Sequence, residues 1–341
     1  MGTTRVAIQA TAVLLLGLSL APLVGGYAPA AGKRPPASGP AISALALPCC
    51  QPVLAARAAA PARQTHAASE LARAYAVSAA AMRQTGPYAD WARSGRQFLA
   101  FDPLGDGRAV EVIGDLSTAD RIVVLVPGVS TRLADFDRGL GGIAARAPAR
   151  QARAVYAEAR TVDPHAKLAV VAWLGYDPPE GLDLEAVRWG RARSGARALE
   201  QFLRELTGVR GDASITLVGQ SYGALVVGLA ARSAGPAVTD LIALGAPGMG
   251  ADRADELGTN ARVWAAQAPS DWIRRVPQLR LFGLGHGVAP ANPDFGALPL
   301  PTAGVVGHDG YLAAGSATLT AVATITVSGA QDRAASEART R

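Results

Sequence analysis

The sequence predicts an α/β protein built on a mostly parallel, doubly wound sheet with an antiparallel hairpin at its edge. Nearly all-apolar runs of strand length alternate with longer helical patterns, as expected of buried strands joined by helices. Two further runs flank the turn-rich stretch "PLGDG" at 103–107, which indicates the hairpin. The 341 residues are 50% hydrophobic, which is ample for a sizeable core.

The predicted elements follow one another at the spacing that such a fold requires. An Ala-rich segment at 65–84 is expected to be a helix, with Thr65 or Ser69 as its cap. The hairpin strands are expected at 96–102 and 108–115. The remaining elements are predicted in this order: strand 121–128, helix 150–162, strand 167–176, helix 184–209, strand 214–220, a helix from 222, strands 239–248 and 261–267, and a closing helix after a glycine-rich loop near 308.

The N-terminal segment is typical of an export signal. Arg5 precedes an uninterrupted apolar run, and small residues follow it near 28–30. The protein is therefore expected to be secreted or held at the cell envelope, and an uncleaved segment would associate it with a membrane. We divide the chain into a signal peptide or anchor at 1–30, an Ala/Pro-rich linker at 31–64, an N-terminal helical segment at 65–94, the α/β domain at 95–329 and a polar tail at 330–341.

Charge and cysteine content argue against several classes of protein. Most of the net charge of +6 lies in residues 1–70, and the nearly balanced remainder lacks the basic clusters of a nucleic-acid-binding face. Cys49 and Cys50 are adjacent in the linker, where a disulfide would close no useful loop. No spacing of His and Cys residues suits zinc. We expect no nucleic-acid partner, no metal and no organic cofactor.

The stretch "ITLVGQSYGALVVGLAA" places one serine between two glycines where a predicted strand meets a predicted helix. A G-x-S-x-G match alone is weak, because tight turns produce it by chance. An apolar strand before it and a small-residue helix after it are the setting of a nucleophile elbow. We interpret Ser221 as a nucleophile and the Tyr222 N–H as an oxyanion donor. The alternative is an ordinary tight turn.

A serine nucleophile needs a base, and the chain has four histidines. His66 precedes the folded body, and His165 lies in a turn upstream of the serine. In the expected chain order of serine, acid and histidine, His286 and His308 remain. We favour His308, because its glycine-rich loop comes late and leads into the closing helix. His286 is then a candidate for lining the substrate pocket.

The acid is expected after a strand that lies between the serine and the base. Asp271 follows such a strand, where its carboxylate would hold the imidazole tautomer and stabilise the imidazolium. Asp252 and Asp255 follow the preceding strand and are the alternatives. Asp271 would also fit as a helix cap in "PSDWIRR". Asp309 adjoins His308 in sequence and is badly placed to orient that ring.

A second oxyanion donor is expected from the loop after an early central strand. "VVLVPGVST" supplies this loop: Gly128 would let the backbone turn sharply, and the Val129 N–H is the candidate donor. Ser130, Gln220 and His286 are the candidates for lining the substrate pocket.

The strings "VVLVPGVST", "VAWLGYDPP", "GQSYGA", "LGAPGMG" and "GHDGYL" together resemble a family of actinobacterial α/β-hydrolases that is catalogued as a domain of unknown function. The similarity covers roughly residues 95–312. It implies an α/β-hydrolase fold with a serine triad, and it supplies no substrate. The family usually has His before the serine, where this chain has Gln220. That position lies outside the triad, so we expect the difference to tune the pocket.

The sequence favours an exported serine hydrolase that uses Ser221, His308 and Asp271 on a carboxylic ester. The substrate is expected to be a small-molecule or lipid-like ester, because aromatic and Pro-rich segments are expected to frame the site. A peptidase, an amidase or a thioesterase would use the same triad. A non-catalytic cell-envelope binding protein with this fold is the alternative from another class.

Overall fold

The computed structural model describes residues 60–181, 184–278 and 285–328, all of which belong to one compact unit, Leu45–Arg341. The predicted signal or anchor, most of the linker with Cys49 and Cys50, and the tail at 330–341 lie outside the described residues. Within the described ranges, no helix has both the length and the apolar composition to cross a bilayer.

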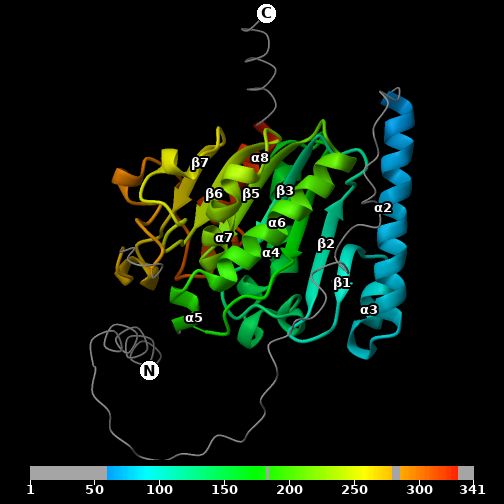
Figure 1. The fold of residues 1–341 in the computed structure, drawn as a ribbon, viewed down its shortest axis with the longest axis horizontal. Helices are drawn as coiled ribbons and strands as arrows, with labels where there is room; N and C mark the ends of the chain where they lie inside the picture. The colour runs from blue at the N-terminus through cyan, green and yellow to red at the C-terminus, as the bar shows by residue number, and fades with distance from the viewer. Residues whose placement is uncertain (1–59, 182–183, 279–284, 329–341) are drawn as a thin grey trace, which may run out of the picture. The chain divides into compact units, whose positions relative to one another are not determined.

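An eight-stranded sheet forms the centre of this unit (Figure 1). β1 pairs antiparallel with β2, β2 pairs antiparallel with β4, and the other neighbours are parallel. This confirms the predicted parallel sheet with an antiparallel hairpin at its edge. The order is β1-β2-β4-β3-β5-β6-β7-β8, with bounds β1 Gln97–Asp102, β2 Arg108–Gly114, β3 Arg121–Val126, β4 Leu168–Leu174, β5 Ser214–Gln220, β6 Val238–Leu244, β7 Arg262–Ala266 and β8 Leu298–Pro299. We did not predict β8, because two residues, one of them a proline, carry no strand pattern.

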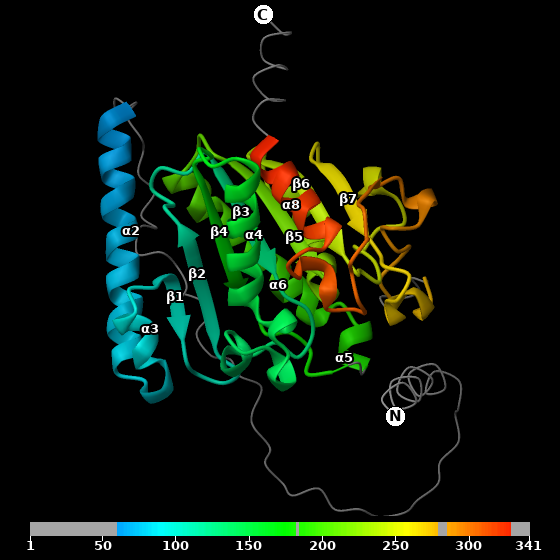
Figure 2. The ribbon, with the colours of Figure 1, turned by 180° about the vertical axis from the view of Figure 1, so that it is seen from behind.

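Helices cover both faces of the sheet. α6 packs on α7 over one face, and α4 packs on α8 over the other (Figures 1 and 2). All seven residues of β4 are buried, which is why this strand is apolar without alternation. The bounds are α2 Ala60–Arg83, α3 Ala89–Arg93, α4 Pro148–Val162, α5 Leu184–Val187, α6 Gly190–Val209, α7 Tyr222–Ala230 and α8 Ala317–Ser328.

The edge strand β1 is covered by the long helix α2, which keeps the edge from pairing with another chain (Figure 1). This helix includes residues 60–64, which we assigned to the linker. Thr65 and Ser69 therefore lie inside the helix, and the prediction that one of them caps it is wrong. The residues before Thr65 are mostly good helix formers, and Pro61 is compatible with a first helical turn, so the helix extends past both local caps.

The single helix predicted at 184–209 is two helices, α5 and α6, with a break at Arg188 and Trp189. The Tyr222 hydroxyl accepts a hydrogen bond from the Ala192 N–H at 3.0 Å and donates one to the Arg188 carbonyl at 3.3 Å. It thus takes the place of the bond that a continuous helix would make between residues 188 and 192. The local pattern could not reveal this break, because the inserted hydroxyl comes from α7.

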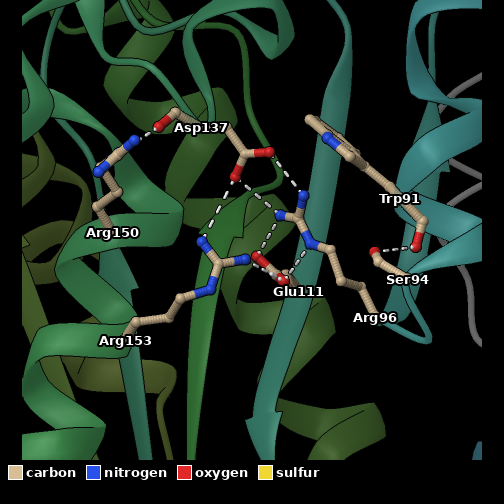
Figure 3. A network of polar contacts seen from close by, with 7 residues as sticks. All are labelled: Trp91, Ser94, Arg96, Glu111, Asp137, Arg150 and Arg153. Atoms are coloured by element: carbon tan, nitrogen blue, oxygen red, sulfur yellow. Dashed lines mark hydrogen bonds and ion pairs between the residues drawn. The ribbon is translucent and has the colours of Figure 1, made fainter.

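A buried carboxylate joins the hairpin to α4 (Figure 3). Glu111 on β2 is 2% exposed, and it accepts from Arg96 at 2.7 and 2.8 Å and from Arg153 at 2.8 Å. Asp137 accepts from Arg96 at 2.6 and 2.9 Å. The Arg96 guanidinium also lies over the Trp91 ring, 4.5 Å from its centroid. Without Glu111, two arginines would lose a buried counter-charge.

We expect Glu111→Ala to lower the free energy of unfolding by about 3 kcal/mol, because the partly buried Arg96 would be left with too little negative charge. In a domain of this size the melting temperature would fall by roughly 6–12 °C, which thermal circular dichroism can measure. The matched control is Arg253→Ala, because Arg253 and its ion-pair partner Asp255 are both exposed. Equal shifts in the two variants would contradict the importance of the buried network.

Candidate active site

Ser221 lies at the sharp turn between β5 and α7. Its φ of 54° and ψ of −124° fall in a region that residues other than glycine rarely adopt. The Ser221 N–H donates to the Leu244 carbonyl at 2.8 Å, which fixes the turn to the end of β6. The hydroxyl does not cap α7, so it does not serve to complete that helix.

The two glycines that flank this turn allow close contacts between backbone segments. A Cβ atom at position 219 would lie 2.5 Å from the Ala224 Cα. A Cβ atom at position 223 would lie 2.2 Å from the Val126 carbonyl oxygen of β3. Both distances are far shorter than real contacts, so a side chain at either position would displace the turn.

The loop after β3 lies directly against the serine. A Cβ atom at position 128 would lie 2.9 Å from the Ser221 Cβ and 3.4 Å from its Oγ. We predicted that Gly128 serves to turn the chain, but the left-handed φ in this loop, 59°, belongs to Ser130. That prediction is wrong: Gly128 is needed because Ser221 leaves no room for a side chain.

Hydrogen bonds to the segment 176–180 hold this loop in place. The buried Tyr176 hydroxyl donates to the Pro127 carbonyl at 2.6 Å. The Ser130 N–H donates to the Pro179 carbonyl at 2.7 Å, and the Ser130 hydroxyl donates to the Glu180 carbonyl at 2.8 Å. The Ser130 side chain, predicted to line a pocket, therefore contacts backbone and helps to position the loop.

Val129 and Tyr222, whose backbone N–H groups are predicted as oxyanion donors, each adjoin one residue of the Gly128–Ser221 contact. Val129 follows the glycine that contacts Ser221, and Tyr222 is the first residue of α7. Among the hydrogen bonds of the described residues, neither N–H is a donor. Their role as oxyanion donors stays a prediction.

Asp271 and His308 are hydrogen-bonded to each other. The His308 Nδ1 lies 2.9 Å from both Asp271 carboxylate oxygens. The Asp271 side chain is fully buried, and that of His308 is 12% exposed. Asp271 Oδ1 also accepts from the Ile273 N–H at 2.9 Å, so Asp271 caps the short turn η7 (Trp272–Arg275) as well. The Asp271 carboxylate therefore has both roles that the sequence suggested, as a helix cap and as the partner of the imidazole.

Gly245, directly after β6, connects this pair to the serine. A Cβ atom at position 245 would lie 2.8 Å from Asp271 Oδ2 and 3.2 Å from His308 Cε1. The preceding residue, Leu244, accepts the hydrogen bond from the Ser221 N–H. The serine and the His–Asp pair thus lie against two consecutive residues at the end of one strand. Their catalytic roles stay predictions.

The other acidic candidates have different surroundings. Asp309 accepts from Arg146 at 2.8 Å, although it is the neighbour of His308 in sequence. Asp255 is exposed and pairs with Arg253. Asp252 lies close to Gly287, where an added Cβ would be 3.0 Å from its Oδ1.

The remaining histidines and the other pocket candidates are also in defined places. His66 and His165 are exposed. His286 packs edge-on against the Tyr222 ring, with the ring centroids 5.9 Å apart, and burial lowers the pKa of its imidazole to about 4. Gln220 accepts from Gln151 at 2.6 Å, so its side chain contacts α4.

Sequence reasoning missed two tyrosines at this site. Tyr311 donates to Asp271 Oδ2, and Tyr176 holds the loop before Val129. Both lie in strings that we singled out, "GHDGYL" and "WLGYDPP". The closeness of both tyrosines in sequence to predicted site residues was the available signal. A buried aromatic residue near the end of a strand, however, ordinarily belongs to the hydrophobic core.

Comparison with known proteins assigns the family. The sequence profile of an alpha/beta hydrolase family matches residues 102–281, which is more than half of the chain. The chain belongs to this family. An uncharacterized protein of Mycobacterium tuberculosis (strain H37Rv) is 30% identical over 212 residues, which cover 60% of this alpha/beta hydrolase and 73% of that protein. This relative supports the resemblance to an actinobacterial family of unknown function. A second uncharacterized M. tuberculosis protein is 31% identical over 232 residues, covering 59% of this chain and 33% of that protein.

Solved structures are similar to this alpha/beta hydrolase at low sequence identity. A serine hydrolase without a lid from Xanthomonas campestris is 15% identical with a TM-score of 0.39, covering 70% of this chain and 94% of that chain. Est1E from Butyrivibrio proteoclasticus is 12% identical with a TM-score of 0.42, covering 69% of this chain and 99% of that chain. The family assignment itself rests on the profile match and the mycobacterial relative. Among the described residues, no group of three or more His, Cys, Asp and Glu side chains is arranged to hold a metal ion.

The lowered pKa of His286 predicts an acid-dependent loss of stability. The unfolded chain takes up this proton near pH 6.5, whereas the folded chain does so near pH 4. The stabilisation is therefore fully present above pH 6.5 and is lost as the pH falls toward 4. We expect urea unfolding at pH 7.5 and 4.5 to show that His286→Gln reduces this loss by about 2–3 kcal/mol. The exposed His165→Gln is the control, and equal pH dependence in both variants would contradict the prediction.

Proposed function

We propose that this alpha/beta hydrolase is an exported serine hydrolase that cleaves carboxylic esters. The observation that carries the proposal is the convergence at Leu244 and Gly245. The strained Ser221 turn is bonded to one of these residues, and the Asp271–His308 pair lies against the other. A hydroxyl, an imidazole and a carboxylate in this order along the chain are the parts of a serine triad.

In the first half of the reaction, the Ser221 Oγ attacks the ester carbonyl carbon and His308 takes the hydroxyl proton. The carbonyl oxygen becomes an oxyanion that accepts from the Val129 and Tyr222 N–H groups. His308 then gives its proton to the leaving alkoxide as the ester C–O bond breaks. The products of this half are the free alcohol and an ester of Ser221.

In the second half, water attacks the carbonyl carbon of the acyl-enzyme while His308 takes a proton from it. The bond between that carbon and the Ser221 Oγ breaks, and the serine recovers its proton from the imidazolium. The carboxylic acid leaves. Asp271 stays ionised throughout, orients the ring and stabilises its charged form.

Two exposed apolar side chains, on segments near His308 and its neighbour Asp309, support a substrate with an apolar group. Val306, two residues before His308, is 79% exposed, and Ile143 is 43% exposed. Their segments are joined by the Arg146–Asp309 ion pair. Exposed large apolar residues on two joined segments fit an ester with an acyl chain or an apolar alcohol better than a charged peptide. Export is proposed from the N-terminal sequence alone.

We expect Ser221→Ala to abolish turnover of p-nitrophenyl esters, with kcat lower by roughly 10⁴-fold or more. A fluorophosphonate probe should label the unaltered protein and not the variant. The control is Ser194→Ala, since this serine is exposed on α6. No labelling of the unaltered protein would contradict the proposal and favour the non-catalytic binding protein. Matched anilides and thioesters of one acyl group separate the esterase from an amidase or a thioesterase.

We expect Gly128→Ala to lower kcat/KM for the same esters by roughly 10²-fold. The added methyl would meet the Ser221 Cβ, and the loop with the Val129 N–H would have to move away. Gly208→Ala on α6 is the matched control, because a Cβ there meets no neighbour. Ester hydrolysis by Gly128→Ala at the unaltered rate would show that this loop does not support the oxyanion.

A further inference from the structure

We propose that Tyr311 is a positioning residue that acts on the imidazole through Asp271. The inference rests on the proposed function, because it assigns to Tyr311 a part in the same reaction. Tyr311 is buried in the turn η9 (Gly310–Leu312), three residues after His308.

The direction of the Tyr311 hydrogen bonds follows from their partners. The hydroxyl lies 3.0 Å from the Ala268 nitrogen, and an amide N–H can only donate, so the hydroxyl accepts there. Its single proton is therefore available for Asp271 Oδ2, at 2.5 Å. A distance this short is typical of a hydroxyl that donates to an ionised carboxylate.

Tyr311 completes a set of donors around the carboxylate. The Ile273 N–H donates to Oδ1, the Tyr311 hydroxyl donates to Oδ2, and the His308 Nδ1 lies 2.9 Å from both oxygens. With the Nδ1 proton directed at Asp271, the Nε2 lone pair of the imidazole is left for the serine proton. The balanced donors thus orient the carboxylate and with it the ring.

The position of Tyr311 is itself fixed. The Ser316 hydroxyl donates to the Tyr311 carbonyl at 2.8 Å and accepts from the Leu319 N–H of α8 at 3.2 Å. On its other side the ring lies against Gly245, where a Cβ atom would be 2.8 Å from Cε2. Burial and the bond to Asp271 raise the pKa of the Tyr311 hydroxyl, so it keeps its proton in the range of enzyme activity.

The other charged groups near the pair are already engaged or exposed. Asp309 is paired with Arg146. Arg274 and Arg275 on η7 are exposed. The Trp272 ring, which packs 4.9 Å from the His308 ring between centroids, is uncharged. Within the described chain, Tyr311 is therefore the side chain besides His308 that bonds to Asp271.

The test is the pH profile of Tyr311→Phe. Without the phenol proton, negative charge on Asp271 is less satisfied and the imidazolium is stabilised. The midpoint of the rising limb of kcat/KM should then move up by roughly 0.5–1 pH unit. The plateau value should fall roughly tenfold, through kcat rather than KM. Tyr75→Phe, which removes a hydroxyl on α2 without a partner among the described residues, is the matched control and should leave both unchanged.

A second variant covers the case in which Tyr311→Phe does not fold because the Ala268 N–H loses its acceptor. Replacement of Tyr311 by 3-fluorotyrosine keeps the shape and makes the hydroxyl a stronger donor. It should move the same midpoint downward. An unchanged midpoint in a folded variant, or a loss of kcat/KM that is equal at every pH, would overturn the proposal and leave Tyr311 a structural residue.

A readout without turnover separates this inference from the proposed function. The proton between His308 and Asp271 should give a far-downfield NMR signal that is lost in His308→Gln. Loss of the Tyr311 donor strengthens the His–Asp bond, so the signal should move further downfield in Tyr311→Phe. A shift in a protein without esterase activity would support the contact and refute only the proposed function, whereas an unmoved signal would overturn the inference.

Discussion

The close approach of backbone segments around Ser221 is the constraint on which the rest of the site depends. The turn holds a non-glycine residue at a φ of 54°, which costs on the order of 1–3 kcal/mol and persists because its surroundings leave no alternative. β3 lies against Gly223, the loop after β3 lies against the serine itself, and β6 accepts the serine N–H. A strained turn of this kind leaves the hydroxyl out of the helix cap, and among the hydrogen bonds of the described residues the Tyr222 N–H has no acceptor. Packing energy spread over the sheet thereby holds a geometry that the local sequence alone would not maintain.

The end of the sheet at which Ser221 lies, formed by the carboxyl ends of the parallel strands, also carries the groups that would act on the serine. Parallel strands end together, so the segments that follow β3, β5, β6 and β7 all start at this end of the sheet. Gly245 illustrates the density of this meeting, because Asp271, His308 and Tyr311 all lie within contact of the position that its Cβ would occupy. One missing side chain thus makes room for a carboxylate, an imidazole and a phenol. The antiparallel hairpin and α2 lie at the lateral side of the sheet that begins with β1, where the Glu111 network serves stability (Figures 1 and 3).

Much of the fold was predictable because buried strands and amphipathic helices have distinct periodicities. The hairpin, the central strands and the closing helix follow from apolar runs and turn residues. The failures have different causes. The break at Arg188 comes from the Tyr222 hydroxyl, which belongs to another helix, and β8 is too short to carry a pattern. Gly128 was recognised as necessary for the wrong reason, because its neighbour in space, Ser221, is distant in sequence.

By itself, the sequence determined the strand–turn–helix setting of Ser221 and the order of serine, acid and base candidates, because both are properties of consecutive or ordered residues. Only the tertiary structure decided that Asp271 faces His308 while Asp309 turns to Arg146. It also revealed that Tyr311 completes the donors around that carboxylate. Hydrogen bonds reach about 3 Å, and which side chains come within that distance is set by how strands register and helices pack. That arrangement is a property of the whole chain, and no local pattern contains it.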